Sequence, residues 1–322
     1  MVAAPATELA GEAAQAERER RVRERWSAAL PGVGAFSRDL YWLAIPAVDA
    51  RYQRRACRGT EGLRWFAYLC RQHIAGRRNL SMLSLGCGTG ALERKLAGIG
   101  AFTTCHGIDL APAAIDAARG EAARAGIAGL RYDVRNLERD GPPGGRHDVA
   151  WFNGSLHHIE RLEPVLDGVR DALAPDGWLF VNEYVGADRF AFPAHQREAM
   201  GAAFALLPAR LRRSCHDVDR GRLVEEVPMP DPAEVMAVDP SEAVRSSAIL
   251  AAIESRFEIV ERNDCGGTLL QFLLAGIAGN FRDDSEDDRR YLEMLFAIED
   301  ALIDAGELQS DFVVLAARPR RA

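Results

Sequence analysis

Three glycines at alternate positions have the spacing in this chain that points most directly to chemistry. Gly86, Gly88 and Gly90 follow the apolar run 80–85 and precede a helical pattern over 91–99. Without Cβ atoms, such a turn can approach a ligand closely, and the helix that follows offers free N–H groups. Strand, glycine turn and helix together predict a cradle for a cofactor.

Two classes of cofactor use such a cradle. Gly86-x-Gly88-x-x-Ala91 satisfies the dinucleotide pattern, and Asp109 follows at about the distance at which an acidic residue grips a ribose. A single match of this kind is weakly specific. The glycines alone therefore leave open a nicotinamide-dinucleotide-binding protein.

Four motifs taken together favour the second class. They are LSLGCGTG at 83–90, GID at 107–109, DVAWFNGSLHHI at 148–159 and LAPDGWLFVNEYVG at 173–186. In order and spacing this set resembles a class I S-adenosylmethionine-dependent methyltransferase, over roughly residues 78–185. Within that class the chain looks most similar to bacterial enzymes that act on small metabolites or sugar-containing compounds.

The resemblance implies which residues hold S-adenosylmethionine. The expected set is Gly86, Gly88, Gly90, Asp109, Leu110, Asn136, Leu137 and Asn153. Asp109 would bind the ribose diol, and the glycines and Asn153 would face the methionine arm. Asn136 stands where an acidic residue usually fixes adenine, and its amide oxygen can accept from the exocyclic amine. The chain departs from the family pattern at Ser84, where an acidic residue is common.

Three side chains after the fourth and fifth predicted strands are candidates for removing a proton from an acceptor hydroxyl. Adjacent histidines usually point apart, so we expect only one of His157 and His158 in the pocket, and we rank His157 before Glu183. Tyr184 would shape the pocket wall. The alternatives are that one histidine caps the next helix while the other is solvated, and that Glu183 bonds to backbone. A general base contributes a factor on the order of 10²–10⁴.

The same residues argue against other chemistries. No metal site is predicted, because His157 and His158 are contiguous and no Cys or carboxylate stands at ligand spacing beside them. FNGS at 152–155 replaces the Asn/Asp-Pro-Pro-aromatic tetrapeptide typical of methyltransferases that act on planar amines of bases or glutamine. This favours a small-molecule acceptor over nucleic acid or protein.

Composition limits the setting. The 322 residues carry a formal charge of −7, which gives no broad basic field for nucleic acid. Six cysteines form no CxxC pair, which is typical of reduced thiols in a cytosol. No signal-peptide pattern begins the chain, and no apolar run is long enough to span a membrane. We therefore expect a cytoplasmic protein and leave its oligomeric state open.

Strands that alternate with helices predict an α/β, Rossmann-like, doubly wound sheet. The predicted strands are 80–85, 102–108, 130–134, 147–152, 178–183, 257–261 and 312–317, and the resemblance implies that the last is antiparallel. Residues 1–35 are expected to be a solvated helix or partly disordered, and the aromatic-rich residues 36–77 a helical cap broken at Pro46. The methyltransferase domain would be 78–322, with an insertion at about 186–240, where the stretch around 227–232 looks like an extended loop.

The leading hypothesis is methyl transfer from S-adenosylmethionine to a small molecule, with oxygen favoured and nitrogen next. A methyltransferase-fold protein that binds the cofactor without transferring methyl is the alternative from another class. The identity of the acceptor is not written in these residues.

Overall fold

One mixed sheet of seven strands organises the molecule. The computed structural model describes residues 6–28 and 37–320, with side chains from residue 15 onward. The strands are β1 (Ser81–Leu85), β2 (Thr104–Asp109), β3 (Leu130–Val134), β4 (His147–Asn153), β5 (Leu173–Tyr184), β6 (Phe257–Gly266) and β7 (Phe312–Pro319). Their order is β3-β2-β1-β4-β5-β7-β6, and β7 runs antiparallel to both neighbours. The predicted doubly wound fold, with its antiparallel last strand, is confirmed.

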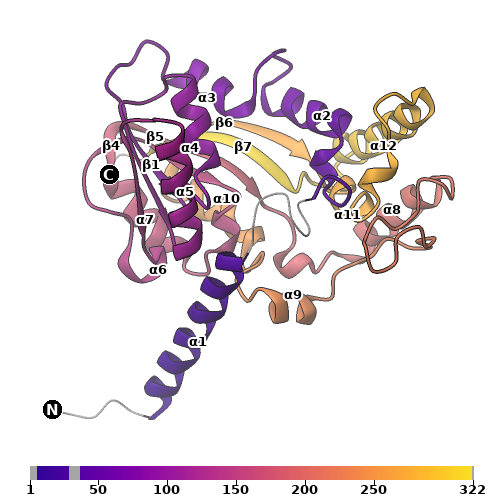
Figure 1. Ribbon diagram of the computed structural model, residues 1–322, viewed down its shortest axis with the longest axis horizontal. Helices are drawn as coiled ribbons and strands as arrows, with labels where there is room; N and C mark the ends of the chain where they lie inside the picture. The colour runs from indigo at the N-terminus through magenta and orange to yellow at the C-terminus, as the bar shows by residue number, and fades with distance from the viewer. Residues whose placement is uncertain (1–5, 29–36, 321–322) are drawn as a thin grey trace.

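Helices cover both faces of this sheet (Figure 1). They are α1 (Ala6–Ala28), α2 (Pro46–Ala56), α3 (Trp65–His73), α4 (Ala91–Gly98), α5 (Pro112–Arg124), α6 (Leu137–Asp140), α7 (Leu162–Ala172), α8 (Ala194–Ala205), α9 (Pro232–Val238), α10 (Ile249–Glu254), α11 (Leu270–Leu273) and α12 (Glu286–Asp304). Short 3₁₀ turns are η2 (Trp42–Ala44), η3 (Leu156–His158), η4 (Asp188–Phe190), η5 (Ser246–Ala248) and η6 (Ala278–Asn280). Among the residues described, no helix is both long and apolar enough to cross a bilayer.

Side chains alternate between two cores along the central strands, as the pleat of a strand requires. Leu83 and Phe152 belong to the core that packs under α7 and α10. Met82 and Trp151 belong to the other core, which the cap and the helical additions cover. Because both faces are buried, the strands read as nearly continuous apolar runs, which is why the sequence located them.

The cap and the insertion pack together as one helical layer with α11 and α12, on the right of Figure 1. Arg51 of α2 forms a fully buried ion pair with Glu299 of α12, with an N–O distance of 2.7 Å. Removing one partner of such a pair leaves an unpaired buried charge, which costs several kcal/mol, about 3–5. The cap is therefore held to the body by more than apolar contact.

The first helix corrects the expectation of a solvated N-terminal segment. The C-terminal half of α1 lies against the body, although the helix runs outward from it in Figure 1. The guanidinium of Arg21 donates to the carbonyl of Ala237 at 2.6 Å, and the indole Nε1 of Trp26 donates to Asp239 at 2.9 Å. Residues 29–35 of the predicted segment lie outside the described residues.

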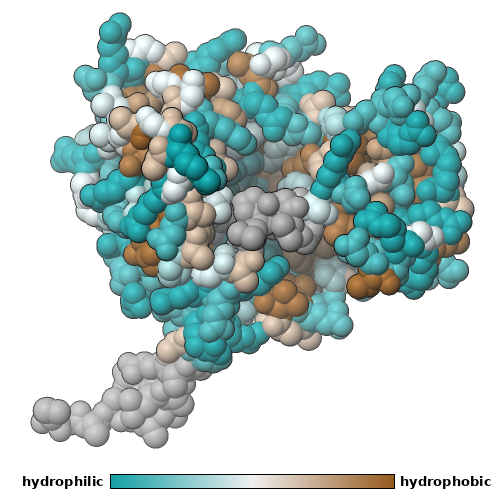
Figure 2. Space-filling model, in the orientation of Figure 1, coloured by the Kyte–Doolittle hydropathy of each residue, from teal (hydrophilic) through white to brown (hydrophobic). Residues whose placement is uncertain are grey.

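Two local expectations were wrong, both at prolines. Pro46 begins α2 at its first helical position and does not break a helix, because a missing N–H costs nothing there. Pro232 likewise begins α9, which Asp231 caps at 2.7 Å, inside a stretch expected to be an extended loop. Figure 2 shows a mostly hydrophilic surface on this side of the molecule, and Met236 and Val238 of α9 are 43% and 63% exposed.

Candidate active site

The glycine turn is folded back onto the end of β2. The N–H groups of Gly86 and Cys87 donate to the carbonyl of Ile108 at 2.9 and 3.0 Å. The N–H of Gly88 donates to the carboxylate of Asp109 at 2.8 Å. Gly86 and Gly88 have φ values of 68° and 52°, a region that only glycine enters without strain.

Asp109 is thus partly committed to the protein itself. Its other oxygen accepts from the N–H of Ala111 at 2.8 Å, which is the capping role considered as the alternative to ribose binding. Burial raises the pKa of Asp109, and the N–H bonds from Ala111 and Gly88 oppose that shift. Since a carboxylate has about four acceptor sites, two bonds leave room for a diol.

A first cavity of about 250 Å³ opens over this turn. Seven of the eight predicted cofactor residues line it: Gly86, Gly88, Asp109, Leu110, Asn136, Leu137 and Asn153. Gly90 does not; it caps α4 with a φ of 75°, and a Cβ there would lie 2.5 Å from the hydroxyl of Tyr132. Gly90 therefore supports the cradle from behind.

The expected adenine contact of Asn136 needs correction. Its side-chain oxygen already accepts from the N–H groups of Glu138 and Arg139, at 2.9 and 3.1 Å, and caps α6. Both lone pairs of that oxygen are used, so it has none left for an exocyclic amine. Asn136 still lines the cavity and can contribute its amide group and its backbone.

The departure at Ser84 is matched by a carboxylate on α4. The hydroxyl of Ser84 donates to Glu93, which is fully buried under the glycine turn. The other oxygen of Glu93 has no hydrogen-bond partner among the described residues. Burial raises the pKa of Glu93 to about 7, against the opposing bond from Ser84. Sequence spacing missed Glu93, because nothing in the helical pattern of 91–99 marks a buried acid.

His157 and Glu183, predicted as alternative bases, form one hydrogen-bonded pair. His157 Nδ1 contacts one oxygen of Glu183, and that oxygen also accepts from the N–H of Tyr184 at 3.0 Å. The other oxygen accepts from the N–H groups of Ser155 and Leu156 at 2.9 and 2.7 Å. Glu183 is only 1% exposed, so it orients His157 rather than facing an acceptor.

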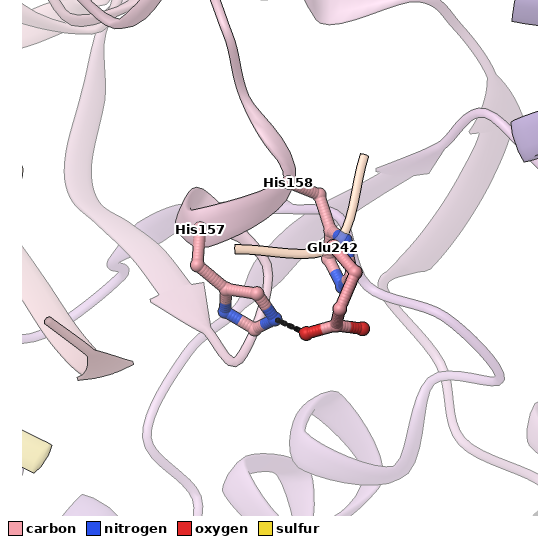
Figure 3. Close-up of side chains that lie close together, drawn as sticks. All are labelled: His157, His158 and Glu242. Atoms are coloured by element: carbon pink, nitrogen blue, oxygen red, sulfur yellow. Dashed lines mark ion pairs between the residues drawn. The ribbon is translucent and has the colours of Figure 1, made fainter. Parts of the chain in front are cut away.

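Both histidines face the same side, contrary to expectation. They stand on η3, where their ring centroids lie 4.1 Å apart. The reason is local: the tight 3₁₀ turn rotates consecutive residues by less than a strand would, so adjacent side chains need not diverge. Glu242, from the loop after the insertion, meets them there, with 3.5 Å between its carboxylate and His157 Nε2 (Figure 3).

The charges around these rings set their protonation. Burial on its own would lower the pKa of His157, but the carboxylates of Glu183 and Glu242 raise it to about 10. Burial and the positive charge of His157 lower the pKa of His158. Glu242, whose burial is outweighed by His158 and His157, has its pKa lowered to about 2. In this arrangement His157 carries a proton at neutral pH and is no free base.

A second cavity, of about 910 Å³, lies beside the first. It is lined by the three predicted catalytic residues, by the cap and by the insertion, including His157, Glu183, Tyr184, Tyr41, Trp42, Tyr52, Phe190, Glu234, Val238 and Phe312. Tyr184 donates its hydroxyl to the carbonyl of Ala187 at 3.0 Å and forms part of the wall. Four residues line both cavities: Trp26, Asn153, Gly154 and His158.

A polar chain connects the cap to the boundary between the cavities. The Tyr52 hydroxyl donates to the side-chain oxygen of Asn182, whose amide donates to Asn153 at 2.7 Å. On the opposite side, the indole of Trp26 packs edge-on against His158, with centroids 4.9 Å apart. The sequence gave no signal for Asn182 or Trp26, which act here through contacts between distant segments.

Comparisons with known proteins agree with this geometry. Residues 83–179 match a family model described as a methyltransferase domain. A ubiquinone biosynthesis O-methyltransferase from Albidiferax ferrireducens is 33% identical over 121 residues, which are 37% of this chain and 44% of that protein. One from Methylobacterium nodulans is 33% identical over 101 residues, 31% of this chain and 39% of that protein. The matches thus span less than half the length of these curated relatives.

Solved structures extend the likeness across nearly the whole chain. Geranyl diphosphate C-methyltransferase from Streptomyces coelicolor superposes with a TM-score of 0.52 at 14% identity, covering 94% of this chain and 98% of that one. A geranyl diphosphate methyltransferase with GPP and sinefungin gives 0.53 at 15% identity, covering 94% and 99%. At such identities the likeness is one of fold. The chain therefore carries a class I S-adenosylmethionine-dependent methyltransferase domain, as the four motifs predicted.

Proposed function

We propose that this protein is a cytoplasmic enzyme that transfers the methyl group of S-adenosylmethionine to a small molecule, most readily to oxygen and next to nitrogen. A sugar-containing or secondary metabolite is the class of acceptor that the motifs favour. The domain match and the glycine cradle support S-adenosylmethionine as the cofactor, and they disfavour the nicotinamide alternative.

The observation that carries this proposal is the common boundary of the two cavities. The first contains the glycine turn and Asp109, and the second contains the aromatic cap residues and His157. A methyl donor in the first cavity and an acceptor in the second would meet at Asn153 and His158. Holding two reactants in line supplies about 7–11 kcal/mol of the barrier reduction, the largest contribution available to a methyl transfer.

The chain's own residues then have distinct tasks. Asp109 and the glycines bind the donor, the apolar and aromatic walls of the second cavity exclude water, and His157 faces the acceptor in an orientation set by Glu183. As methyl moves, the acceptor atom forms a bond to carbon, the carbon–sulfur bond breaks, and the electron pair stays on the sulfur of S-adenosylhomocysteine. Tyr184 shapes the cavity rather than ionising, because burial strongly raises its pKa.

Formation of S-adenosylhomocysteine from metabolite pools tests the reaction directly. Asp109→Ala should weaken S-adenosylhomocysteine binding by about 1.5–3 kcal/mol in calorimetry, the scale of hydrogen bonds to a charged group. Asp116→Ala is the matched control, because Asp116 is exposed on α5 and lies outside the cavity. Binding without turnover on any pool would favour the alternative protein that holds the cofactor without transferring methyl.

A further inference from the structure

The cluster of His157, His158 and Glu242 has no assigned task beyond facing the acceptor cavity. Each offers one ligand atom, and these atoms all lie within 4.8 Å of one another (Figure 3). The separation between Glu242 and His157 Nε2 is 3.5 Å. Two ligand atoms bound to one tetrahedral zinc ion lie about 3.4 Å apart, since each is roughly 2.0–2.1 Å from the metal. The pair already stands at that spacing.

The surroundings of the cluster are those that support metal ligands. Histidine ligands commonly donate their second nitrogen to a carboxylate, which fixes the ring. Glu183 does this for His157 Nδ1, and the backbone N–H groups of Ser155 and Leu156 hold Glu183 in turn. His158 is oriented by Ser241, at 3.1 Å from its Nδ1.

The loop that carries Glu242 is fixed to the histidine turn. The N–H of Val244 donates to the carbonyl of His157 at 3.1 Å, and the Arg189 guanidinium donates to the carbonyl of Glu242 at 2.9 Å. The position of the carboxylate therefore depends on backbone contacts. Spacing along the sequence could not reveal this third group, because it arrives from beyond the insertion.

We propose that His157, His158 and Glu242 bind one divalent first-row transition-metal ion whose open position faces the second cavity. Two imidazoles and one carboxylate suit zinc, iron, cobalt or manganese, whereas magnesium prefers an all-oxygen shell. All three residues line the 910 Å³ cavity, so an oxygen of the acceptor can complete the coordination.

Binding of the ion is independent of the proposed function, but its task rests on it. A hydroxyl bound to such an ion ionises at much lower pH than a free one. Its proton passes to water in the cavity, the oxygen forms the bond to the methyl carbon, and the carbon–sulfur bond breaks with its electron pair left on sulfur. The acceptor atom would then be oxygen, in agreement with the preference stated above.

Metal titration of chelator-treated full-length protein tests the site without an activity assay. Calorimetry with Zn²⁺ should show one saturable site, and Co²⁺ should give visible absorption from ligation by the same groups. Glu242→Gln and His158→Asn should each lower affinity at least tenfold, and Glu183→Gln, which acts through His157, about 10–100-fold. Glu234→Gln is the matched control, a carboxylate change in the same cavity wall away from the cluster.

Thermal melts of each variant establish that it is folded before its affinity is compared. No saturable site in the wild type, or equal affinity in folded Glu242→Gln and Glu234→Gln, overturns the metal site. Undiminished methyl transfer by protein that binds no ion does the same and leaves the proposed function standing. An ion bound with the expected losses in the variants, but no S-adenosylhomocysteine from any acceptor, supports the site and overturns the proposed function.

Discussion

The cofactor cavity and the acceptor cavity share a boundary but are built in different ways. The first lies at the ends of β1, β2 and β3, and most of its wall comes from short turns next to those strands. The second is assembled from the cap, the insertion and the loop that carries Glu242, segments distant from one another in sequence. The difference shows that one fold can combine a donor site made of local motifs with an acceptor site made of long-range packing.

Gly88→Val is the change with the largest expected effect on this comparison. Nothing lies within 4 Å of a Cβ at Gly88, so the new side chain would project into open space at the cradle and abolish S-adenosylhomocysteine binding. Gly100→Val is the control: it has a similar positive φ and equally open space, but it is outside the cavity. Similar melting temperatures with binding lost only in Gly88→Val would attribute the effect to the cradle.

Glu93→Gln should change how stability depends on pH. Burial raises the pKa of Glu93 from 4.5 to about 7, so the stability it contributes is fully present below pH 4.5 and is lost as pH rises through about 7. The loss is on the order of 3 kcal/mol, and Gln should avoid it. Denaturant unfolding at pH 5 and pH 8 should show a smaller difference in the variant than in the wild type. Equal differences would mean that Glu93 does not titrate in this range.

A part of the slope should remain in that variant, and its origin can be named. Burial also raises the pKa of Asp311 to about 7. Asp311→Asn should reduce the slope separately, and since Asp311 accepts from Gln196 of the insertion at 2.9 Å, it reports on the acceptor side of the molecule.

Tyr52→Phe should affect the acceptor side by itself. It removes the donor to Asn182 and leaves that buried oxygen without its partner, a loss of about 1–3 kcal/mol. We expect kcat/KM for the acceptor to fall while the S-adenosylhomocysteine affinity stays within twofold. Tyr68→Phe removes a similar hydroxyl contact, to Glu261 at 2.8 Å, away from both cavities. Equal losses in donor affinity and acceptor turnover would show that the two cavities are not separable.

Trp26→Phe is expected to have the smallest effect and to reach both sides. It deletes the bond from Nε1 to Asp239 but keeps an aromatic ring against His158, which should cost about 1 kcal/mol. Because Trp26 lines both cavities, donor affinity and acceptor KM should each change several-fold. Arg20→Ala, on the exposed side of α1, should change neither. An effect on one cavity only would contradict this boundary role.

The sheet and the donor site were readable from the sequence because their signals are local. Apolar runs bounded by glycines identified the strands, and Gly86, Gly88 and Asp109 follow strands whose ends must converge in a parallel sheet. Where tertiary contact competed with local pattern, the sequence misled: the oxygen of Asn136 went to a helix cap, and the solvated helix at the N-terminus became a cavity wall.

Only the tertiary structure decided how the acceptor side works. The pairing of His157 with Glu183, the arrival of Glu242 beside both histidines and the chain from Tyr52 to Asn153 all join residues from different elements. Their distances depend on how the cap and the insertion pack on the sheet, and no spacing rule along the chain encodes that packing. The local chain therefore determined the donor cradle, while long-range burial and hydrogen bonding determined the groups that would meet the acceptor.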